Sequence, residues 1–388
     1  MIYLDHNATT PPDQAAVEAV RETLTVEWGN PSSIHSVGER ARMVVERARD
    51  QVATLVGCQR GSVIFTSGGT ESCHLALWSC LASDPRRQRI VTSRVEHSAV
   101  REVVRAHEAR GGAVEWLEVD RCGRVDLEQV TTALSRHDDV ALVSVQWANS
   151  ETGVIQDVAA IGRICRGRGI PFHVDAVQWA GKGAVDLGSL PIDLLSISAH
   201  KFYGPKGAGA LIAAPSTVVR ALLVGGPQER GRRGGTEAVP AIAGLGVAAD
   251  LASKWLCGEG VRGVLAVAAM RDAFEDRITR AVAGSLVIAG GVTRTFNTSL
   301  ISFPGLEASA LVVALSRRGV CASAGAACSS GSLEPSPALL AMGVAREAAH
   351  GAVRFSFGRA ADEALANDAA DRVISVVGKM ALLGGSPP

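Results

Sequence analysis

The stretch Ile197–Gly209, which reads ISAHKFYGPKGAG, decides the fold class. It begins at the end of an apolar segment, Asp193–Ser198, and runs into a loop rich in glycine and proline. Lys201 therefore lies where a predicted strand ends. Ligands of open α/β sheets bind beside the carboxyl ends of the strands. By position alone, Lys201 is either a site lysine or an ordinary solvated loop lysine.

Short apolar runs alternate with helix-like segments on both sides of this stretch, through the first two thirds of the chain. This alternation predicts an α/β fold with a mostly parallel sheet covered on both faces. The predicted strands are Ser62–Thr66, Arg89–Thr92, Val114–Val119, Ala141–Gln146, Pro171–Val174, Leu194–Ser198 and Gly209–Ala213. The predicted helices are Val37–Leu55, Glu71–Leu81, Ala99–Ala109, Leu127–Leu134 and Val158–Arg168.

The pattern changes after about residue 250. A chain of 388 residues exceeds one ordinary core, so two domains are expected. We expect a large domain over 13–255 and a smaller α+β domain made of 1–12 and 256–388. The elements predicted in the smaller domain are a helix over Gly260–Val282, a strand over Thr295–Ser302, and helices over Glu307–Arg318 and Asp362–Leu382.

Composition narrows the class of protein. Hydrophobic residues make up 47% and charged residues 20%, with 39 basic and 39 acidic side chains, which is typical of a globular chain without a field that attracts nucleic acid or anionic membranes. The N-terminal MIYLDHNATTPP has no secretory signal, and charges interrupt every apolar stretch before it reaches a membrane-spanning length. The eight cysteines are scattered without a CxxC pair. We therefore expect no metal site and a reducing cytoplasm.

Three other strand ends carry polar groups. Asp175, in HVDAVQ, ends a predicted buried strand and needs a cationic partner, which is either a structural salt bridge or a protonated pyridine nitrogen such as that of pyridoxal phosphate. Gly69 and Thr70, in TSGGTES, lie where a strand meets a helix N-terminus, a place suited to phosphate. His97, in VEHSAV, either stacks on a flat ring or is an ordinary loop histidine.

Taken together, these motifs carry a resemblance. In order and spacing, the chain from Tyr3 to about Arg359 resembles the class V aminotransferase superfamily of fold-type I pyridoxal-phosphate enzymes, and within it the NifS/IscS-type cysteine desulfurases. That resemblance implies conversion of L-cysteine to L-alanine, with sulfur passed to an enzyme cysteine as a persulfide and then to an acceptor protein. The motifs are YLDHNATT, FTSGGTES, EHSAV, HVDAVQ, SAHKFYGPKG, RRGGTE, ACSSGSLEPS and VRFSFGR.

The resemblance also assigns roles to residues. Lys201 would bind the cofactor, Asp175 would pair with its pyridinium nitrogen, and His97 would stack on its ring and assist proton transfer. Arg354 would bind the substrate carboxylate, with Asn7 nearby. The other implied cofactor contacts are Gly69, Thr70, Ser150, Gln178, Ser198, His200 and Thr236. Thr236 matches a threonine that reaches the phosphate of the neighbouring subunit, which implies a homodimer.

A cysteine that can be deprotonated is needed to take the sulfur. ASAGAACSSGS, from Ala322 to Ser332, contains only small residues, so it predicts a loop, within about 321–333, that places Cys328 centrally. Cys321 competes for the role, although it follows an apolar pair where a buried inert cysteine is common. The LEPS that follows matches the subgroup that serves acceptor proteins, in iron–sulfur cluster assembly or thio-modification.

The chain departs from the family pattern at several positions. Ser150, in WANSETG, stands where the family has a second asparagine, so we expect a contact to the cofactor ring to be lost or bridged by water. Cys73 and His74 also replace the more usual pair in ESCH. Two alternatives stay open: the same cofactor with another reaction, such as a selenocysteine lyase or an aminotransferase, and a non-catalytic sulfur-transfer or scaffold protein. Cys328 argues against the first, and intact Lys201 against the second.

Overall fold

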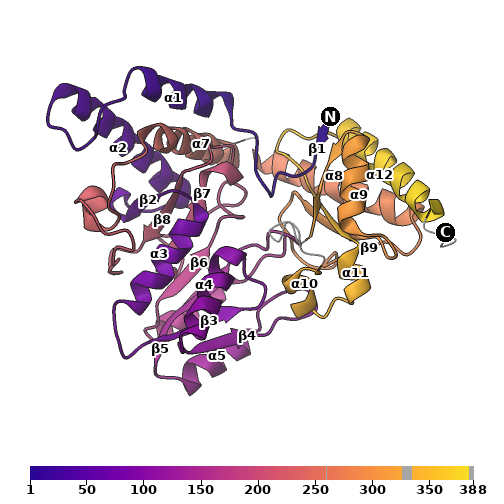
Figure 1. Cartoon of the computed structure of the whole chain (residues 1–388), viewed down its shortest axis with the longest axis horizontal. Coiled ribbons are helices and arrows are strands. Elements are labelled where there is room, and N and C mark those ends of the chain that lie inside the picture. Colours follow the sequence, from indigo (N-terminus) through magenta and orange to yellow (C-terminus); the bar gives the residue numbers. More distant parts are fainter. Residues whose placement is uncertain (259, 326–333, 384–388) are drawn as a thin grey trace.

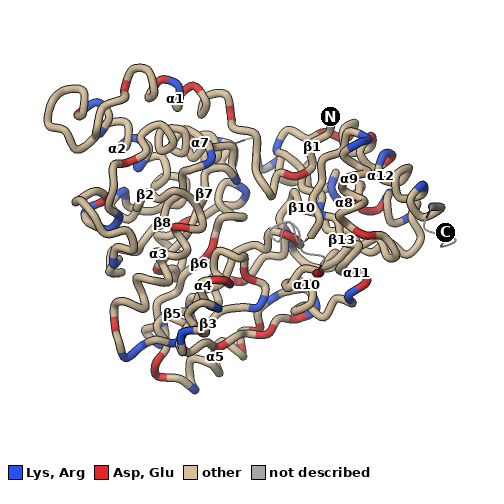
Figure 2. Tube along the Cα trace, viewed as in Figure 1, with Lys and Arg blue, Asp and Glu red and all other residues tan. Residues whose placement is uncertain are grey.

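The computed structural model describes residues 1–258, 260–325 and 334–383. Figure 1 shows a larger α/β part that contains α1 to α7, beside a smaller part that contains β1 and the chain from α8 onward. Lys and Arg side chains are interspersed with Asp and Glu over both parts, as Figure 2 shows, in keeping with a formal net charge of zero.

A seven-stranded sheet forms the centre of the larger part, in the order β2-β8-β7-β6-β5-β3-β4. Its strands pair in parallel except β8, which runs antiparallel to both of its neighbours. All seven predicted strands are present, each within two residues of its predicted ends. They are β2 (Val63–Thr66), β3 (Arg89–Ser93), β4 (Val114–Leu117), β5 (Val140–Gln146), β6 (Phe172–Asp175), β7 (Leu194–Ser198) and β8 (Gly209–Ala213).

Helices cover both faces of this sheet. On one face, α3 and α4 pack in a core with residues such as Ile64 and Leu142; on the other, α2, α5, α6 and α7 pack in a larger core. Because both faces are covered, the central strands β5, β6 and β7 are buried along their whole length. The helices of this part are α1 (Gln14–Thr25), α2 (Ser36–Val56), α3 (Gly69–Leu81), α4 (Ser98–Ala109), α5 (Leu127–Arg136), α6 (Val158–Gly167) and α7 (Val239–Cys257).

Helix α7 was not predicted from the sequence. It is apolar on all sides, so it lacks the polar face that marks an amphipathic helix. By length and composition alone it could cross a membrane, but half of its apolar window (50%) is buried within the structure. Residues such as Leu245 and Ala249 of α7 are fully buried. It packs against α1 and α2 as a core helix.

The smaller part joins both ends of the chain. Ile2 and Leu4 share a core with residues of α8, α9, α12 and β13, so the N-terminus packs with the C-terminal segments. The exact domain boundaries, between residues 12 and 13 and between residues 255 and 256, remain a prediction. The helices of the smaller part are α8 (Gly260–Ala281), α9 (Ala308–Arg317), α10 (Pro337–Ala341), α11 (Arg346–His350) and α12 (Glu363–Leu383). Its strands are β1 (Ile2–Tyr3), β9 (Leu286–Val287), β10 (Thr298–Ser302), β11 (Val320–Cys321), β12 (Ser323–Ala324) and β13 (Ala352–Ser356).

Candidate active site

A cavity of about 190 Å³ lies at the carboxyl ends of the central strands. Gln146 at the end of β5 pairs in register with Asp175 at the end of β6, and Ser198 ends the adjacent β7. Parallel strands therefore bring these side chains to one edge of the sheet. Nine of the residues singled out in the sequence line the cavity: Gly69, Thr70, His97, Ser150, Asp175, Gln178, Ser198, His200 and Lys201.

The N-terminus of α3 forms one wall of the cavity. Gly68 precedes the helix with φ 152°, a conformation that side chains rarely adopt. A Cβ on Gly69 would lie 2.7 Å from Cγ2 of Val177, so only glycine leaves room there. Ser72 and Thr66 are hydrogen-bonded to each other at 2.7 Å, which ties the first turn of the helix to the end of β2. Backbone N–H groups of a first helical turn lack partners within the helix, so this wall is suited to an anion.

Asp175 is buried below the cavity. Its carboxylate accepts a hydrogen bond from the backbone N–H of Val177 at 3.0 Å, and the thiol of Cys73 lies beside it. Burial raises the pKa of Asp175, while His97 and Lys201 act in the opposite direction. No ion pair with Asp175 occurs among residues 1–258, 260–325 and 334–383. The carboxylate is thus suited to a cationic ligand in the cavity.

Lys201 follows β7 in a short 3-10 turn, η2 (Ala199–Lys201). Its ammonium group donates hydrogen bonds to the backbone carbonyls of Asn7 at 2.6 Å and Ala8 at 3.0 Å. Burial together with the charge of Lys201 lowers the pKa of the neighbouring His200 to about 4, which keeps that ring neutral. The amine of Lys201 is therefore held at the cavity by the N-terminal segment of the chain.

His97 is the N-cap of α4. Its Nδ1 accepts a hydrogen bond from the backbone N–H of Ala99 at 3.1 Å. In the neutral ring this assigns the proton to Nε2. The cap fixes the orientation of the ring, which lines the cavity.

The side chains of Asn7 and Gln178 belong to one buried network. Gln178 donates to the backbone carbonyl of Asn7 at 2.9 Å. The Lys182 ammonium donates to Oδ1 of Asn7 at 2.9 Å and to Oε1 of Gln178 at 2.7 Å. Burial lowers the pKa of Lys182 well below its usual range, and the charges of Lys201 and Arg354 add to that effect. Lys182 thus orients both amides.

Arg354, on β13, reaches the site from the smaller part. Its Nη2 donates to Asp5 at 2.7 Å and its Nη1 donates to the carbonyl of Ser150 at 2.9 Å. The remaining Nε is buried without a hydrogen-bond partner. A guanidinium held in this way still has donors to offer a carboxylate.

Three of the predicted residues that the structure describes do not line the cavity: Asn7, Arg354 and Thr236. Thr236 is exposed on the loop before α7 and does not line the cavity. Cys328 lies outside the described residues, as does most of the segment predicted to be a loop. Its competitor Cys321 is half-buried in β11, which pairs with β1.

Sequence reasoning missed three buried ionisable residues of this site, namely Lys182, Glu96 and Glu151. Lys182 follows Gln178 by four residues, a spacing that could have linked the two side chains in a helical turn. Glu96 and Glu151 each stand beside a predicted site residue, in the motifs EHSAV and WANSETG. Nothing in the motifs indicated that their carboxyl groups are buried.

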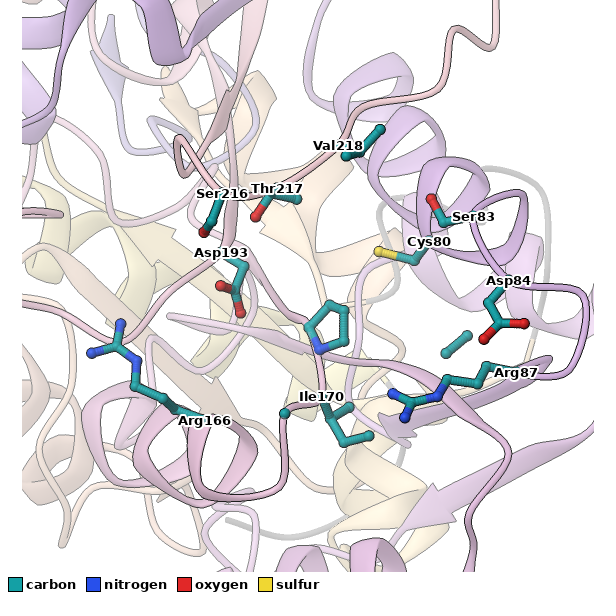
Figure 3. A pocket seen from close by; sticks show the side chains of 13 residues that line it. Cys80, Ser83, Asp84, Arg87, Arg166, Ile170, Asp193, Ser216, Thr217 and Val218 are labelled. Atoms are coloured by element: carbon teal, nitrogen blue, oxygen red, sulfur yellow. The ribbon is translucent and has the colours of Figure 1, made fainter.

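A second, larger cavity of about 460 Å³ lies at the amino ends of the central strands. Figure 3 shows Asp193 and Arg166 on one side of it and Cys80 and Arg87 on the other. It contains none of the predicted site residues. Asp193 already accepts a hydrogen bond from the backbone N–H of Phe172 at 2.8 Å, which gives the carboxylate a structural role.

Comparison with known proteins decides the family. The family model described as aminotransferase class-V matches residues 2–365. The chain belongs to the class V aminotransferase family. Within this family it is 45% identical over 357 residues to a cysteine desulfurase of Cereibacter sphaeroides, covering 92% of this chain and 90% of that protein. It is 43% identical over 377 residues to the cysteine desulfurase NifS of Azotobacter vinelandii, with coverages of 97% and 91%.

A solved structure supports the same assignment. The structure titled NIFS-like protein matches with a TM-score of 0.90 at 32% identity, covering 97% of this chain and 99% of that chain. The fold class and the family expected from the motifs are both confirmed. The relatives support cysteine desulfurase activity for this member of the class V aminotransferase family.

Proposed function

We propose that the chain is a pyridoxal-phosphate-dependent cysteine desulfurase that acts in the cytoplasm as a homodimer. It converts L-cysteine to L-alanine and passes the sulfur through Cys328 to an acceptor protein, for iron–sulfur cluster assembly or thio-modification. The balance is simple: L-cysteine and one enzyme thiol give L-alanine and one enzyme persulfide. The carbon–sulfur bond breaks, a sulfur–sulfur bond forms, and the substrate carbon takes up a proton.

The observation that carries the proposal is that Asp175 and Lys201 line the same cavity. Asp175 offers a buried carboxylate that forms no ion pair among the described residues, which is what a protonated pyridine nitrogen requires. The N-terminus of α3, with Gly69 and Thr70, offers N–H groups to a phosphate. Lys201 offers the amine. These three features on three strand ends fit pyridoxal phosphate.

Other residues that line the cavity, together with Thr236 of a second subunit, would make the remaining cofactor contacts. Ser198 and His200 would hold the phosphate, with Thr236 contributed by the neighbouring subunit. Ser150 and Gln178 line the cavity on the side of Asn7, where a ring oxygen would lie. When bound, pyridoxal phosphate supplies an electron sink that makes bonds to the substrate α-carbon easier to break.

The protein's own groups would then bind and move protons. Arg354 would bind the α-carboxylate of cysteine. Asn7, whose backbone carbonyl accepts a hydrogen bond from Lys201, would lie near the same substrate. Lys201 would take and return the proton at the α-carbon, as a positioned amine can. His97, held by its Nδ1 cap, would exchange a proton through Nε2. Cys328 would attack the substrate sulfur as a thiolate.

Two observations support a homodimer. Trp28 and Ile34, in the segment between α1 and α2, are exposed to 69% and 96%, which is unusual for large apolar side chains. A groove lined by Pro31, Ser32 and Glu237 connects this segment with the loop that carries Thr236. A second copy of the chain seated on this face would cover the apolar side chains and receive Thr236.

The test is a Cys328→Ala variant, with Cys321→Ala as the matched control. Cys328→Ala should keep the visible absorbance of the bound cofactor and still bind cysteine, but lose the persulfide seen by mass spectrometry of the intact protein. Cys321→Ala should retain both. Unchanged sulfide release by Cys328→Ala would overturn the assignment and would favour a different reaction on the same cofactor.

A further inference from the structure

The carboxyl group of Glu151 lies close enough to Arg354, the proposed carboxylate-binding residue, to be affected by its charge. Glu151 follows Ser150 in the turn after β5, and the side chain of Asn149 fixes this turn by accepting the backbone N–H groups of Glu151 and Thr152 at 2.9 and 2.8 Å. The carbonyl of Ser150 accepts from Arg354. The backbone that carries Glu151 therefore also orients Arg354.

The two carboxyl oxygens of Glu151 have different surroundings. Oε1 accepts a hydrogen bond from the hydroxyl of Ser336, the N-cap of α10, at 2.9 Å. Oε2 is buried without a hydrogen-bond partner, and a Cβ added to Gly325 would lie 3.4 Å from it. A buried carboxylate with a single donor is poorly satisfied, because an ionised carboxylate has about four lone-pair sites to fill.

The charged groups around Glu151 come from two elements. Arg354 on β13, and Arg101 and His97 on α4, attract its negative form, and Ser336 from α10 donates to it. Burial outweighs all of them and raises the pKa of Glu151 to about 7. The group therefore changes its charge within the pH range of the cell.

The charge balance at Arg354 gives this titration a consequence. Asp5 already pairs with Arg354 at 2.7 Å, so the pair is close to neutral when Glu151 is protonated. When Glu151 ionises, it adds a negative charge near Arg354, and that charge opposes the approach of a ligand carboxylate. Like charges brought near each other disfavour binding.

We propose that Glu151 is a positioning residue that makes recognition of the substrate carboxylate at Arg354 depend on pH. Its neutral carboxyl group admits the carboxylate, and its ionised form opposes it. This inference rests on the proposed function, because it takes Arg354 as the carboxylate-binding residue. By linkage, a ligand carboxylate must raise the affinity of Glu151 for its proton by the same factor.

The experiment measures binding of L-alanine, the product, to the holoenzyme by titration calorimetry between pH 6 and 8.5. The dissociation constant for the wild type, divided by that for Glu151→Gln, should be near one at pH 6. It should rise to about tenfold at pH 8.5, since tenfold corresponds to a shift of about one pKa unit. Titration of the alanine amine is common to both proteins and cancels in the ratio. A ratio that stays constant with pH would overturn the inference.

Two controls make the result specific. Ethylamine, which lacks the carboxylate, should give a ratio that does not change with pH; the same rise with ethylamine would refute the proposal. Ser336→Ala removes a donor that favours the ionised form of Glu151, so the rise in the dissociation constant should begin at higher pH than in the wild type. An unshifted onset would contradict the role of Glu151 even if Glu151→Gln does not fold.

Arg354→Gln separates this inference from the proposed function. If alanine binds as tightly to Arg354→Gln as to the wild type, Arg354 is not the carboxylate site, and both proposals about it fail. If binding depends on Arg354 but the ratio is constant with pH, only the role of Glu151 fails.

Discussion

The carboxyl groups of Glu96 and Asp175 are both buried, and the charge of Asp175 acts on Glu96. Burial, with a smaller contribution from the charge of Asp175, raises the pKa of Glu96 to about 8. Glu96 is held by the hydroxyl of Ser93 at 2.5 Å, while its Oε2 has no partner. Because a like charge nearby favours the neutral form of a carboxyl group, the charge of Asp175 favours the protonated form of Glu96.

Replacing Glu96 with glutamine should therefore change how stability depends on pH. Folded Glu96 binds its proton up to about pH 8, whereas its ordinary pKa is 4.5. Between these values the folded state holds more protons than the unfolded state, so wild-type stability falls as pH rises. Relative to Glu96→Gln, the wild type should lose about 2 kcal/mol from pH 6 to pH 8. Urea unfolding of both holoenzymes at the two pH values measures this.

The exposed Glu347, on α11, provides the matched control. Glu347→Gln should give stability profiles parallel to those of the wild type. Parallel profiles for Glu96→Gln as well would show that Glu96 does not hold a proton in the folded protein.

At the scale of elements, the seven strands of the large sheet could be predicted from sequence, whereas helices α1 and α7 of the same part could not. The strands of the sheet read as short apolar runs between turn residues, a local signal. Helix α7 is largely apolar and lacks the broad polar face of an amphipathic helix, and α1 (Gln14–Thr25) has only two buried residues, Ala16 and Thr23. The strand order, with β8 between β2 and β7, depends on long-range packing that no local pattern reveals.

The candidate site shows the same contrast between residues that local sequence predicts and contacts that it does not. The residues at strand ends, such as Asp175 and Lys201, could be placed because parallel strands end at one edge. The partners that hold them could not, since Asp5 meets Arg354 and Lys182 meets Asn7 across more than a hundred residues of chain. Contacts of that kind arise only when segments far apart in the chain pack together, within the smaller part for Asp5 and Arg354 and between the two parts for Asn7 and Lys182.

A buried ion pair anchors the loop that carries Thr236. Arg49 on α2 forms two hydrogen bonds with Glu229, at 2.8 and 2.7 Å, and Glu229 also accepts the backbone N–H of Phe65 at 3.0 Å. Glu229 and Arg230 hold φ values of 47° and 59°, which are unfavourable for non-glycine residues. The ion pair therefore stabilises a strained turn in η3 (Gln228–Gly231).

Arg49→Met should destabilise the protein by about 3–5 kcal/mol, because it leaves the Glu229 carboxylate buried without its cation. The double variant Arg49→Met/Glu229→Met should recover much of this loss, since no buried charge then remains. The free energy of unfolding in urea checks both. A loss below about 1 kcal/mol for Arg49→Met, which is typical of an exposed pair, would contradict the anchoring role.

At the scale of the whole molecule, the chain supplies most of one site but leaves part of it at a distance. Thr236 is exposed and lies outside the cavity that the other cofactor residues line. The exposed Trp28 and Ile34 lie near the same loop. Symmetric dimers bury the same patch on both copies, so one interface would deliver Thr236 to both sites at once.

A hybrid dimer tests whether Thr236 acts on the neighbouring site. Thr236→Ala alone should weaken cofactor retention about tenfold, the effect of one hydrogen bond to a charged group, and Lys201→Ala should be inactive. In a dimer of one Lys201→Ala and one Thr236→Ala chain, purified through two different tags, one site receives both Lys201 and the Thr236 of its neighbour. That dimer should recover about half of the wild-type desulfurase activity, because one of its two symmetric sites is intact. If Thr236 serves its own chain, neither site is complete, and the activity of the hybrid dimer stays no higher than that of the Thr236→Ala dimer.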